Sequence, residues 1–229
     1  MALNRVQAID DRVRVKTALV SVWDKSGLDL LVTGLLSASP GVRLLSTGGT
    51  YKVLQTILGS EAQHSLQQIS DYTGQPEMQG GLVKTLDFKV YLGLLSETYN
   101  QSHADDMARA GAVPIDMVVV NLYPFGSVVN RPDTTPETAR ANIDIGGPCM
   151  VRAAAKNFHR VAALTDPADY HDVLAELAKE SGALSLATRW RLAQKAFAVT
   201  AAYDAAICLY LTRVGLEQVA ADYDVRVGG

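Results

Sequence analysis

One glycine-rich segment has the composition of an anion-binding loop. Ser46-Thr47-Gly48-Gly49-Thr50 follows a short apolar run and precedes a segment of helical periodicity that begins at about Tyr51. The first N–H groups of a helix have no partner within the helix, two glycines let an anion approach them closely, and three hydroxyls add donors. The segment therefore fits a phosphate cradle, and a tight turn with a helix cap fits it as well.

Polar side chains follow other apolar runs in the same way. Asp24-Lys25-Ser26-Gly27 comes after the run at 17–23, and Asn121 and Tyr123 end the most apolar strand-like run. The segment Gly80-Gly81-Leu82-Val83-Lys84-Thr85 adds a lysine and a threonine after a flexible pair. Ligands of parallel α/β sheets bind beyond the carboxyl ends of the strands, which makes these residues candidates for one site. For Asn121 and Tyr123, an aromatic cover over the sheet edge is an equal alternative.

An aspartate and a lysine flank a predicted helix start. Asp144 lies just before Gly146-Gly147-Pro148, where Pro148 fits near the first helical position. Lys156 lies on the same predicted helix among alanines, at spacing i, i+4 from Arg152. A lysine beside an aspartate in a cleft forms a proton-transfer pair, so we expect these two residues to act together. A solvated helix face is the alternative for Lys156.

The elements that must position these residues alternate between strands and helices. Four runs rich in Val, Ile and Leu are apolar at consecutive positions, as in strands buried on both faces; they lie at 17–23, 42–47, 115–123 and 160–165. Segments that follow these runs carry apolar residues on one side of a helix, as in helices that pack on a sheet. The spacing is i, i+3, i+4 and i+7 at 28–35 and 170–177, and i, i+1, i+4 and i+5 at 53–58. The pattern predicts an α/β fold with a mainly parallel sheet.

The carboxy-terminal part of the chain has a different pattern. From Ser185, a plausible N-cap, to about Val214 the sequence is rich in alanine and almost free of helix breakers. We expect one domain over 1–229, with a core at about 16–183 and a helical extension at about 185–215. The tail after the extension is expected to form a last strand or to fray.

Composition excludes several classes of protein. The net charge of −3 is spread without basic blocks, which argues against nucleic acid as a partner. The two cysteines, Cys149 and Cys208, are too few for a disulfide scaffold, and the four histidines have no ligand spacing, so we expect no metal and no cofactor. The amino terminus lacks a signal-peptide core, and the most apolar stretch is interrupted by Asp204. We expect a cytoplasmic protein that neither crosses nor binds a membrane.

A series of motifs then carries a resemblance to a known family. In chain order these motifs are SVWDKSG, STGGT, SDYTGQPEM, VKTL, PIDMVVVNLYPF, NIDIGGPCMVRAAAKN, DPADY and KAFAVTAAYDAAI. Their order resembles that of the IMP cyclohydrolase domain of the bifunctional purine-biosynthesis enzyme, from about Thr17 to about Leu211. The NLYPF and IDIGG…RAAAKN blocks are the most specific of them.

The resemblance implies a methylglyoxal-synthase-like, three-layer α/β/α fold and a ring-closing reaction. In that reaction the carboxamide nitrogen of 5-formamidoimidazole-4-carboxamide ribotide attacks the formyl carbon, and water leaves to give IMP. Carried over by motif, Asp144 and Lys156 would transfer protons, while Lys84 and Tyr123 would polarise the formyl oxygen. The substrate-binding residues implied by resemblance or by loop position are Trp23, Lys25, Ser46, Thr47, Gly48, Gly49, Thr50, Leu82, Thr85, Asn121, Gly146 and Gly147. We also expect a homodimer and a separate formyltransferase as a partner, since the family's second domain is absent from this sequence.

Departures from the family pattern leave the substrate open. Trp23 and Leu82 replace a hydroxyl and a guanidinium that help to bind phosphate in the family, and Phe158 and Val199 stand where the family has histidines. Loss of a bidentate arginine should weaken phosphate binding by about 1.5–3 kcal/mol. The alternatives are a related cyclase that acts on a different amide, with or without a phosphate, and a nucleotide-binding protein without catalysis.

Overall fold

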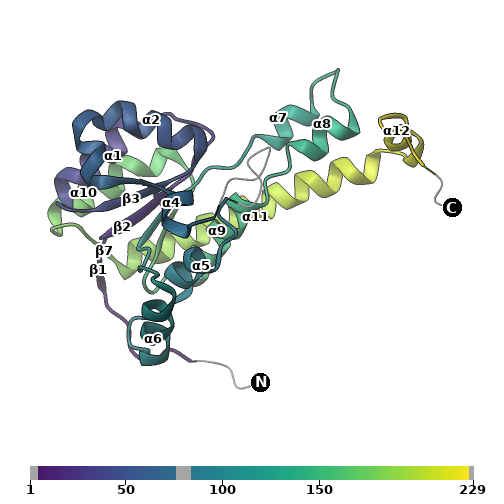
Figure 1. Cartoon of the computed structure of the whole chain (residues 1–229). Coiled ribbons are helices and arrows are strands. Elements are labelled where there is room, and N and C mark those ends of the chain that lie inside the picture. Colours follow the sequence, from purple (N-terminus) through teal and green to yellow (C-terminus); the bar gives the residue numbers. More distant parts are fainter. Residues whose placement is uncertain (1–4, 76–83, 227–229) are drawn as a thin grey trace.

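The computed structural model describes residues 5–75 and 84–226, and its centre is a five-stranded parallel sheet (Figure 1). The strand order is β4-β3-β2-β5-β6, and every neighbouring pair is parallel. The strands are β2 (Thr17–Val20), β3 (Arg43–Ser46), β4 (Leu66–Gln68), β5 (Met117–Val119) and β6 (Ala162–Leu164). Four of these five strands lie inside the four predicted apolar runs, and the fifth, β4, has a polar sequence that gave no strand signal.

Helices cover both faces of the sheet, which gives the predicted three-layer α/β/α arrangement. One face is covered by α1 (Leu28–Ala38), α2 (Gly48–Leu58) and α10 (Tyr170–Lys179). The other is covered by α4 (Ile69–Thr73), α5 (Phe88–Leu95), α9 (Gly146–Lys156) and the first half of α11 (Leu186–Arg213). The shorter helices are η1 (Gly59–Glu61), α3 (Ala62–Ser65), α6 (Gln101–Ala110), α7 (Phe125–Val129), α8 (Pro136–Ala141), η3 (Pro167–Asp169) and α12 (Leu216–Ala221).

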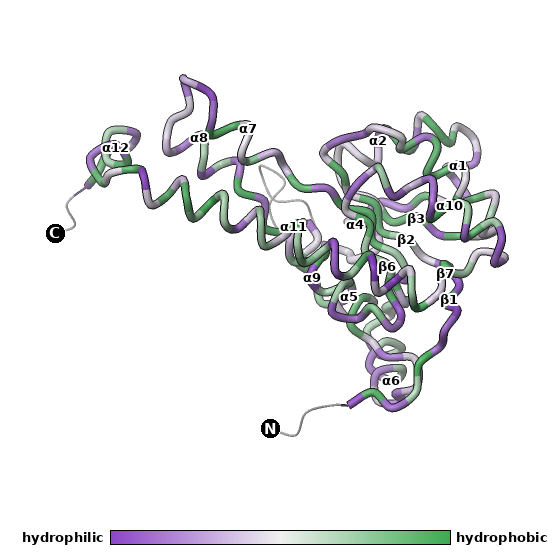
Figure 2. Tube along the Cα trace, turned by 180° about the vertical axis from the view of Figure 1, so that it is seen from behind, coloured by the Kyte–Doolittle hydropathy of each residue, from purple (hydrophilic) through white to green (hydrophobic). Residues whose placement is uncertain are grey.

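Alternation along the strands explains why two cores form. In β2, the side chains of Ala18 and Val20 enter the core under α1 and α10, while Leu19 enters the core under α5 and α9. Successive residues of a strand point to opposite faces, so a run that is apolar at every position supplies both cores. Figure 2 shows the apolar strands in the middle of the body, with polar segments around them.

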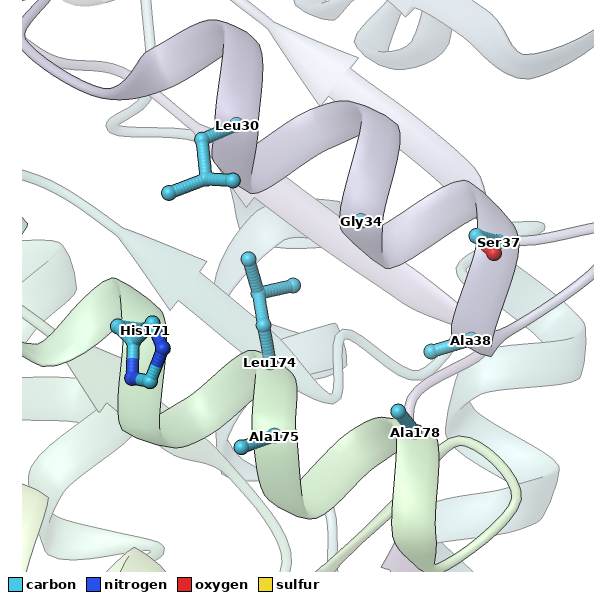
Figure 3. Close-up of a pocket in the computed structure, with 8 residues that line it drawn as sticks. All are labelled: Leu30, Gly34, Ser37, Ala38, His171, Leu174, Ala175 and Ala178. Carbon is cyan, nitrogen blue, oxygen red and sulfur yellow. The ribbon is translucent and has the colours of Figure 1, made fainter.

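Close packing of α1 on α10 depends on one glycine. A Cβ built at Gly34 would lie 2.7 Å from Cδ2 of Leu174, so only a residue without a side chain lets Leu174 seat against α1 at this point. Figure 3 shows Leu174 pointing at α1, with Leu30 and His171 at one end of the groove between the two helices.

The long helix α11 extends well beyond the α/β body (Figure 1). It begins as the sequence pattern predicts, because Ser185 is its N-cap and accepts a hydrogen bond from the Thr188 N–H at 3.3 Å. Its outer half packs against α7 and α8 through Tyr203, Ile207 and Tyr210. The expectation of a strand or a frayed tail is wrong for 216–221, which forms the short helix α12.

A buried arginine joins the start of α11 to the rest of the molecule. Arg189 is 1% exposed, and its guanidinium donates to backbone carbonyls of Asp10, Asp11, Phe158, His159 and Leu184. It lies beside a two-stranded antiparallel ladder of β1 (Arg12–Arg14) and β7 (Ala183–Ser185), which the sequence pattern did not predict. Carbonyl oxygens compensate the buried charge, so Arg189 serves as a structural clamp.

Candidate functional site

A cleft of about 390 Å³ opens at the carboxyl ends of β2, β3 and β5. Such a volume lies in the ordinary range for small-molecule sites, and this edge is where ligands of parallel sheets bind. We call it the sheet-edge cleft. Most of the predicted site residues line it: Trp23, Lys25, Thr47, Gly48, Gly49, Thr50, Lys84, Thr85, Asn121, Tyr123, Asp144, Gly146 and Gly147.

The start of α2 forms one wall of the sheet-edge cleft and has the features of an anion cradle. The helix begins at Gly48, three residues earlier than the periodicity predicted, and Gly48 has a φ of 40°. A Cβ at Gly48 would lie 3.0 Å from Nζ of Lys84, so the ammonium group lies directly over the first turn. A positive side chain and the positive end of a helix therefore act on the same point.

The three hydroxyls of the glycine-rich segment have structural partners. Ser46 is fully buried and donates to the Val20 carbonyl at 2.8 Å, so it does not line the cleft. The Thr47 hydroxyl lies 2.8 Å from that of Ser21, and the Thr50 hydroxyl accepts from the N–H of Val22 at 3.1 Å and donates to its carbonyl at 3.0 Å. These bonds join the end of β3 to the end of β2. Beside these hydroxyls, the backbone N–H groups at the start of α2 and the Lys84 ammonium also border the cleft.

Asn121 orders the loop that carries Trp23. Its Oδ1 accepts from the N–H of Trp23 at 2.6 Å and of Asp24 at 2.8 Å, and its Nδ2 donates to the Asp24 carbonyl at 2.9 Å. Lys25 turns its ammonium back to the carbonyls of Val22 and Trp23, and burial lowers the pKa of Lys25. The Trp23 side chain, 53% exposed, stands at the mouth of the cleft.

Asp144 lies at another wall of the sheet-edge cleft, just before α9. Its Oδ1 accepts from the Gly147 N–H at 2.8 Å, and the backbone N–H of Tyr123 also donates to its carboxylate. Burial raises the pKa of Asp144 in spite of these two donors. A carboxylate that is held in place and has a raised pKa can accept a proton and return it.

Thr85 connects the two walls. Its Oγ1 would lie 2.7 Å from a Cβ at Gly146, so the hydroxyl meets the first residue of α9. A Cβ at Gly147 would lie 2.4 Å from Oδ2 of Asp144. Both glycines are therefore needed for this close approach, while Pro148 is the third residue of α9 and not its first. Lys84 thus lies at the N-terminus of α2, and the next residue, Thr85, lies at the N-terminus of α9.

Lys156 lies elsewhere. It is the last residue of α9, and an 11-residue helix is about 16 Å long. Lys156 is exposed and lines a separate cavity of about 890 Å³, which we call the distal pocket, with His103, Asn157 and His159. The expected contact between Asp144 and Lys156 within one chain is therefore wrong, because Asp144 precedes the first residue of α9, Lys156 is its last, and the length of the helix separates them.

Other predicted residues have different outcomes. Leu82 lies outside the described residues. Tyr203 was not predicted from the sequence. Its hydroxyl accepts from the backbone N–H of Asp144 at 2.7 Å, a contact between α11 and a loop 59 residues away for which local sequence gives no signal.

Among residues 5–75 and 84–226, no group of three His, Cys, Asp or Glu side chains could hold a metal ion. No helix in the same part of the chain is long and apolar enough to cross a membrane.

Two family models match the chain. The model described as the MGS-like domain matches residues 31–149, and the model described as the AICARFT/IMPCHase bienzyme matches residues 154–227. The first match contains the strands β3, β4 and β5 and most of the sheet-edge cleft. The second begins within α9 and includes all of α11.

Curated relatives and a solved structure agree with these models. The bifunctional purine biosynthesis protein PurH of Leptospira biflexa is 45% identical over 206 residues, which are 90% of this chain and 39% of that protein. PurH of Synechococcus sp. is 50% identical over 195 residues, or 85% of this chain and 36% of that protein. The chain thus spans less than two fifths of either relative. The crystal structure of ForH superimposes with a TM-score of 0.70 at 38% identity, covering 85% of this chain and 98% of ForH.

Proposed function

Because the chain belongs to the family of IMP cyclohydrolase domains of PurH-like proteins, we propose that it catalyses dehydrative ring closure of a formamido carboxamide. The leading substrate is 5-formamidoimidazole-4-carboxamide ribotide, and the product is IMP. The observation that carries the proposal is the sheet-edge cleft, which Asp144 and Tyr123 line together with an anion cradle.

The reaction forms one C–N bond and expels one water. The carboxamide nitrogen attacks the formyl carbon, and the formyl oxygen leaves with one proton from the carboxamide nitrogen and one from the formamide nitrogen. An amide nitrogen is a weak nucleophile, so holding both substituents in near-attack geometry supplies much of the rate. The walls of the cleft would provide that geometry, with the 5′-phosphate at the start of α2.

We assign the proton transfers to Asp144. Its carboxylate is fixed by the Gly147 and Tyr123 N–H groups, and burial raises its pKa, so it is a stronger base than an exposed aspartate. It would take the proton of the carboxamide nitrogen and pass it to the leaving oxygen. The Tyr123 hydroxyl would donate to the formyl oxygen as negative charge develops there.

Lys84 has two proposed roles, which are to bind the 5′-phosphate and to polarise the formyl oxygen. Its position over Gly48 suits the 5′-phosphate, and its neighbour Thr85 reaches the start of α9. The expected role of Lys84 in polarising the formyl oxygen stays a prediction. So does a proton-transfer role for Lys156, which would require a second copy of the chain to bring that residue to the cleft.

A second candidate is a related cyclase with a different amide substrate. Trp23 favours it, because an exposed indole at the mouth of the cleft offers an apolar surface next to the anion cradle. Such a surface suits a ring or a non-phosphorylated group better than a fully hydrated phosphate. In either case the substrate is an N-formyl compound, so a formyl-transfer reaction must supply it, and a separate formyltransferase is the expected partner.

The test is ultraviolet-monitored turnover of the formylated ribotide beside its phosphate-free nucleoside. We expect the ribotide to be converted to IMP, and an Asp144→Asn variant to convert it at least about 100-fold more slowly under the same conditions. Turnover of the nucleoside alone would favour the second candidate. Absence of turnover of both, together with absence of IMP binding, would contradict the proposed function.

A further inference from the structure

The hydroxyl of Tyr203 spans the loop that carries Asp144. It accepts a hydrogen bond from the backbone N–H of Asp144 at 2.7 Å and donates to the backbone carbonyl of Asn142 at 3.4 Å. One side chain of α11 thus satisfies two backbone groups on either side of Ile143. Satisfying both groups fixes the backbone from which the Asp144 carboxylate projects.

Tyr203 is itself held firmly. It is 9% exposed, and its ring meets the Phe125 ring edge to face, with the centroids 6.2 Å apart and an interplanar angle of 67°. Phe125 begins α7 and follows Tyr123 by two residues. Tyr203 therefore contacts both segments of the cleft wall, the one with Asp144 through its hydroxyl and the one with Tyr123 through its ring.

The electrostatic surroundings keep the proton on this hydroxyl. Burial is the main cause of a raised Tyr203 pKa. The hydrogen bond from the Asp144 N–H lowers this pKa, and the charges of Asp144, Asp204 and Tyr123 raise it. The hydroxyl can therefore donate to the Asn142 carbonyl while it accepts from the Asp144 N–H. Both hydrogen bonds are retained at neutral pH.

We propose that Tyr203 is a positioning residue for the ring closure, which aligns the Asp144 carboxylate with the Gly147 N–H and with the substrate. This inference rests on the proposed function. Tyr203 touches the backbone of Asp144 and not the reacting atoms, so its effect must pass through the loop. Without the hydroxyl, the Asp144 N–H loses its partner, and the loop relaxes toward solvent.

The experiment compares Tyr203→Phe with Tyr210→Phe. Tyr210 lies on the same helix and also meets Phe125 edge to face, at 5.9 Å, but its hydroxyl has no hydrogen bond among the described residues. Both changes remove one hydroxyl and keep the ring. Tyr203→Phe should lower kcat by about 10- to 100-fold and leave KM within about threefold. This is expected when a reacting group is slightly misplaced and substrate binding is unchanged. Tyr210→Phe should leave both parameters near those of the unaltered chain.

Two NMR readouts separate failure of this inference from failure of the proposed function. In Tyr203→Phe, the Asp144 amide should exchange with solvent at least about tenfold faster, and the pKa of its carboxyl should fall toward the ordinary aspartate range. Both quantities can be measured even if no substrate is turned over. Equal behaviour of the two phenylalanine variants would overturn the inference. So would an Asp144 amide that already exchanges freely in the unaltered chain, a result that needs no variant at all.

Discussion

The two ends of α9 use similar polar residues for different purposes. At its first turn, Gly146 and Gly147 leave space for Thr85 and Asp144, and the polar groups face a cleft. At its last turn, the Asn157 amide donates to the carbonyls of Leu94 at 2.8 Å and Ser96 at 2.9 Å. One helix therefore carries the candidate chemistry at one end and a structural junction at the other.

The structural end is built around a buried ion pair. Arg160 and Asp116 are about equally buried, and their side chains meet at 3.0 Å. Arg160 also donates to the carbonyls of Gly93 and Ser96, and Asp116 accepts from the N–H groups of Lys16 and Thr17. The guanidinium nitrogens of Arg160 and both carboxylate oxygens of Asp116 have hydrogen-bond partners within the protein core, whereas Asp144 at the other end lines the sheet-edge cleft. A charged residue indicates a reactive site only when its partners leave part of it available.

The largest effect is expected at the first turn of α9. Asp144→Asn should lower kcat by about 10²- to 10⁴-fold, since an amide cannot accept the proton of the carboxamide nitrogen. The matched control is Asp172→Asn, which removes an exposed carboxylate on α10 and should change kcat less than about twofold. Steady-state turnover of the formylated ribotide checks both variants.

The pH dependence of kcat/KM in the unaltered chain also tests whether Asp144 acts as the base. Burial raises the pKa of Asp144, so the carboxylate becomes protonated at a higher pH than an ordinary aspartate. As pH falls through that pKa, kcat/KM should fall about tenfold per unit, because only the deprotonated form is a base. A profile whose acid limb is the same in Asp144→Asn would assign the limb to another group.

At the structural end, Arg160→Met should reduce stability and spare the site. Removal of the guanidinium leaves Asp116 buried and unpaired, which costs about 3–5 kcal/mol of the free energy of unfolding. Protonation would relieve this charge, so the loss should be smaller in acid than at neutral pH. Urea unfolding followed by circular dichroism measures it. A large fall in kcat of the fraction that remains folded would show that the two ends of α9 are coupled.

A smaller effect is expected at the anion cradle. Gly48→Ala places a Cβ 3.0 Å from the Lys84 ammonium and forces a φ of 40° on alanine, so it should raise KM for the ribotide by about tenfold. Gly59→Ala is the control, since it also puts alanine at a positive φ, 54°, but at the other end of α2, where a Cβ meets no atom within 4 Å. The phosphate-free nucleoside should respond equally to both variants. An equal rise of KM for the ribotide would remove Lys84 from the cradle.

The smallest effect is expected for Lys156. Because it lies about 16 Å along α9 from the cleft, Lys156→Ala should change kcat by less than about threefold within a single chain. Lys179→Ala, an exposed lysine at the end of α10, provides the baseline. A fall of about 100-fold or more would contradict this prediction and would mean that a second copy of the chain supplies Lys156 to the cleft.

More of the fold than of the candidate site could be predicted from the sequence. Consecutive apolar residues in β2, β3, β5 and β6 identify strands buried on both faces, whereas β4 is short and polar and has no such signal. The glycines at 48, 146 and 147 were recognised because a backbone that other groups approach closely requires glycine, and paired glycines are visible in the local sequence. The pairing of Asp144 with Lys156 was wrong because a motif that spans a helix does not say which end faces the ligand. Tyr203 depends on how α11 docks, and only tertiary structure shows that.

A structure of the chain with bound IMP tests the central claim most directly, namely that the sheet-edge cleft holds the nucleotide. We predict the phosphate at the first turn of α2 beside Lys84, and the purine ring next to Asp144 and Tyr123, within hydrogen-bond distance of at least one of them. IMP bound instead in the distal pocket, against Lys156 and His103, would contradict the account.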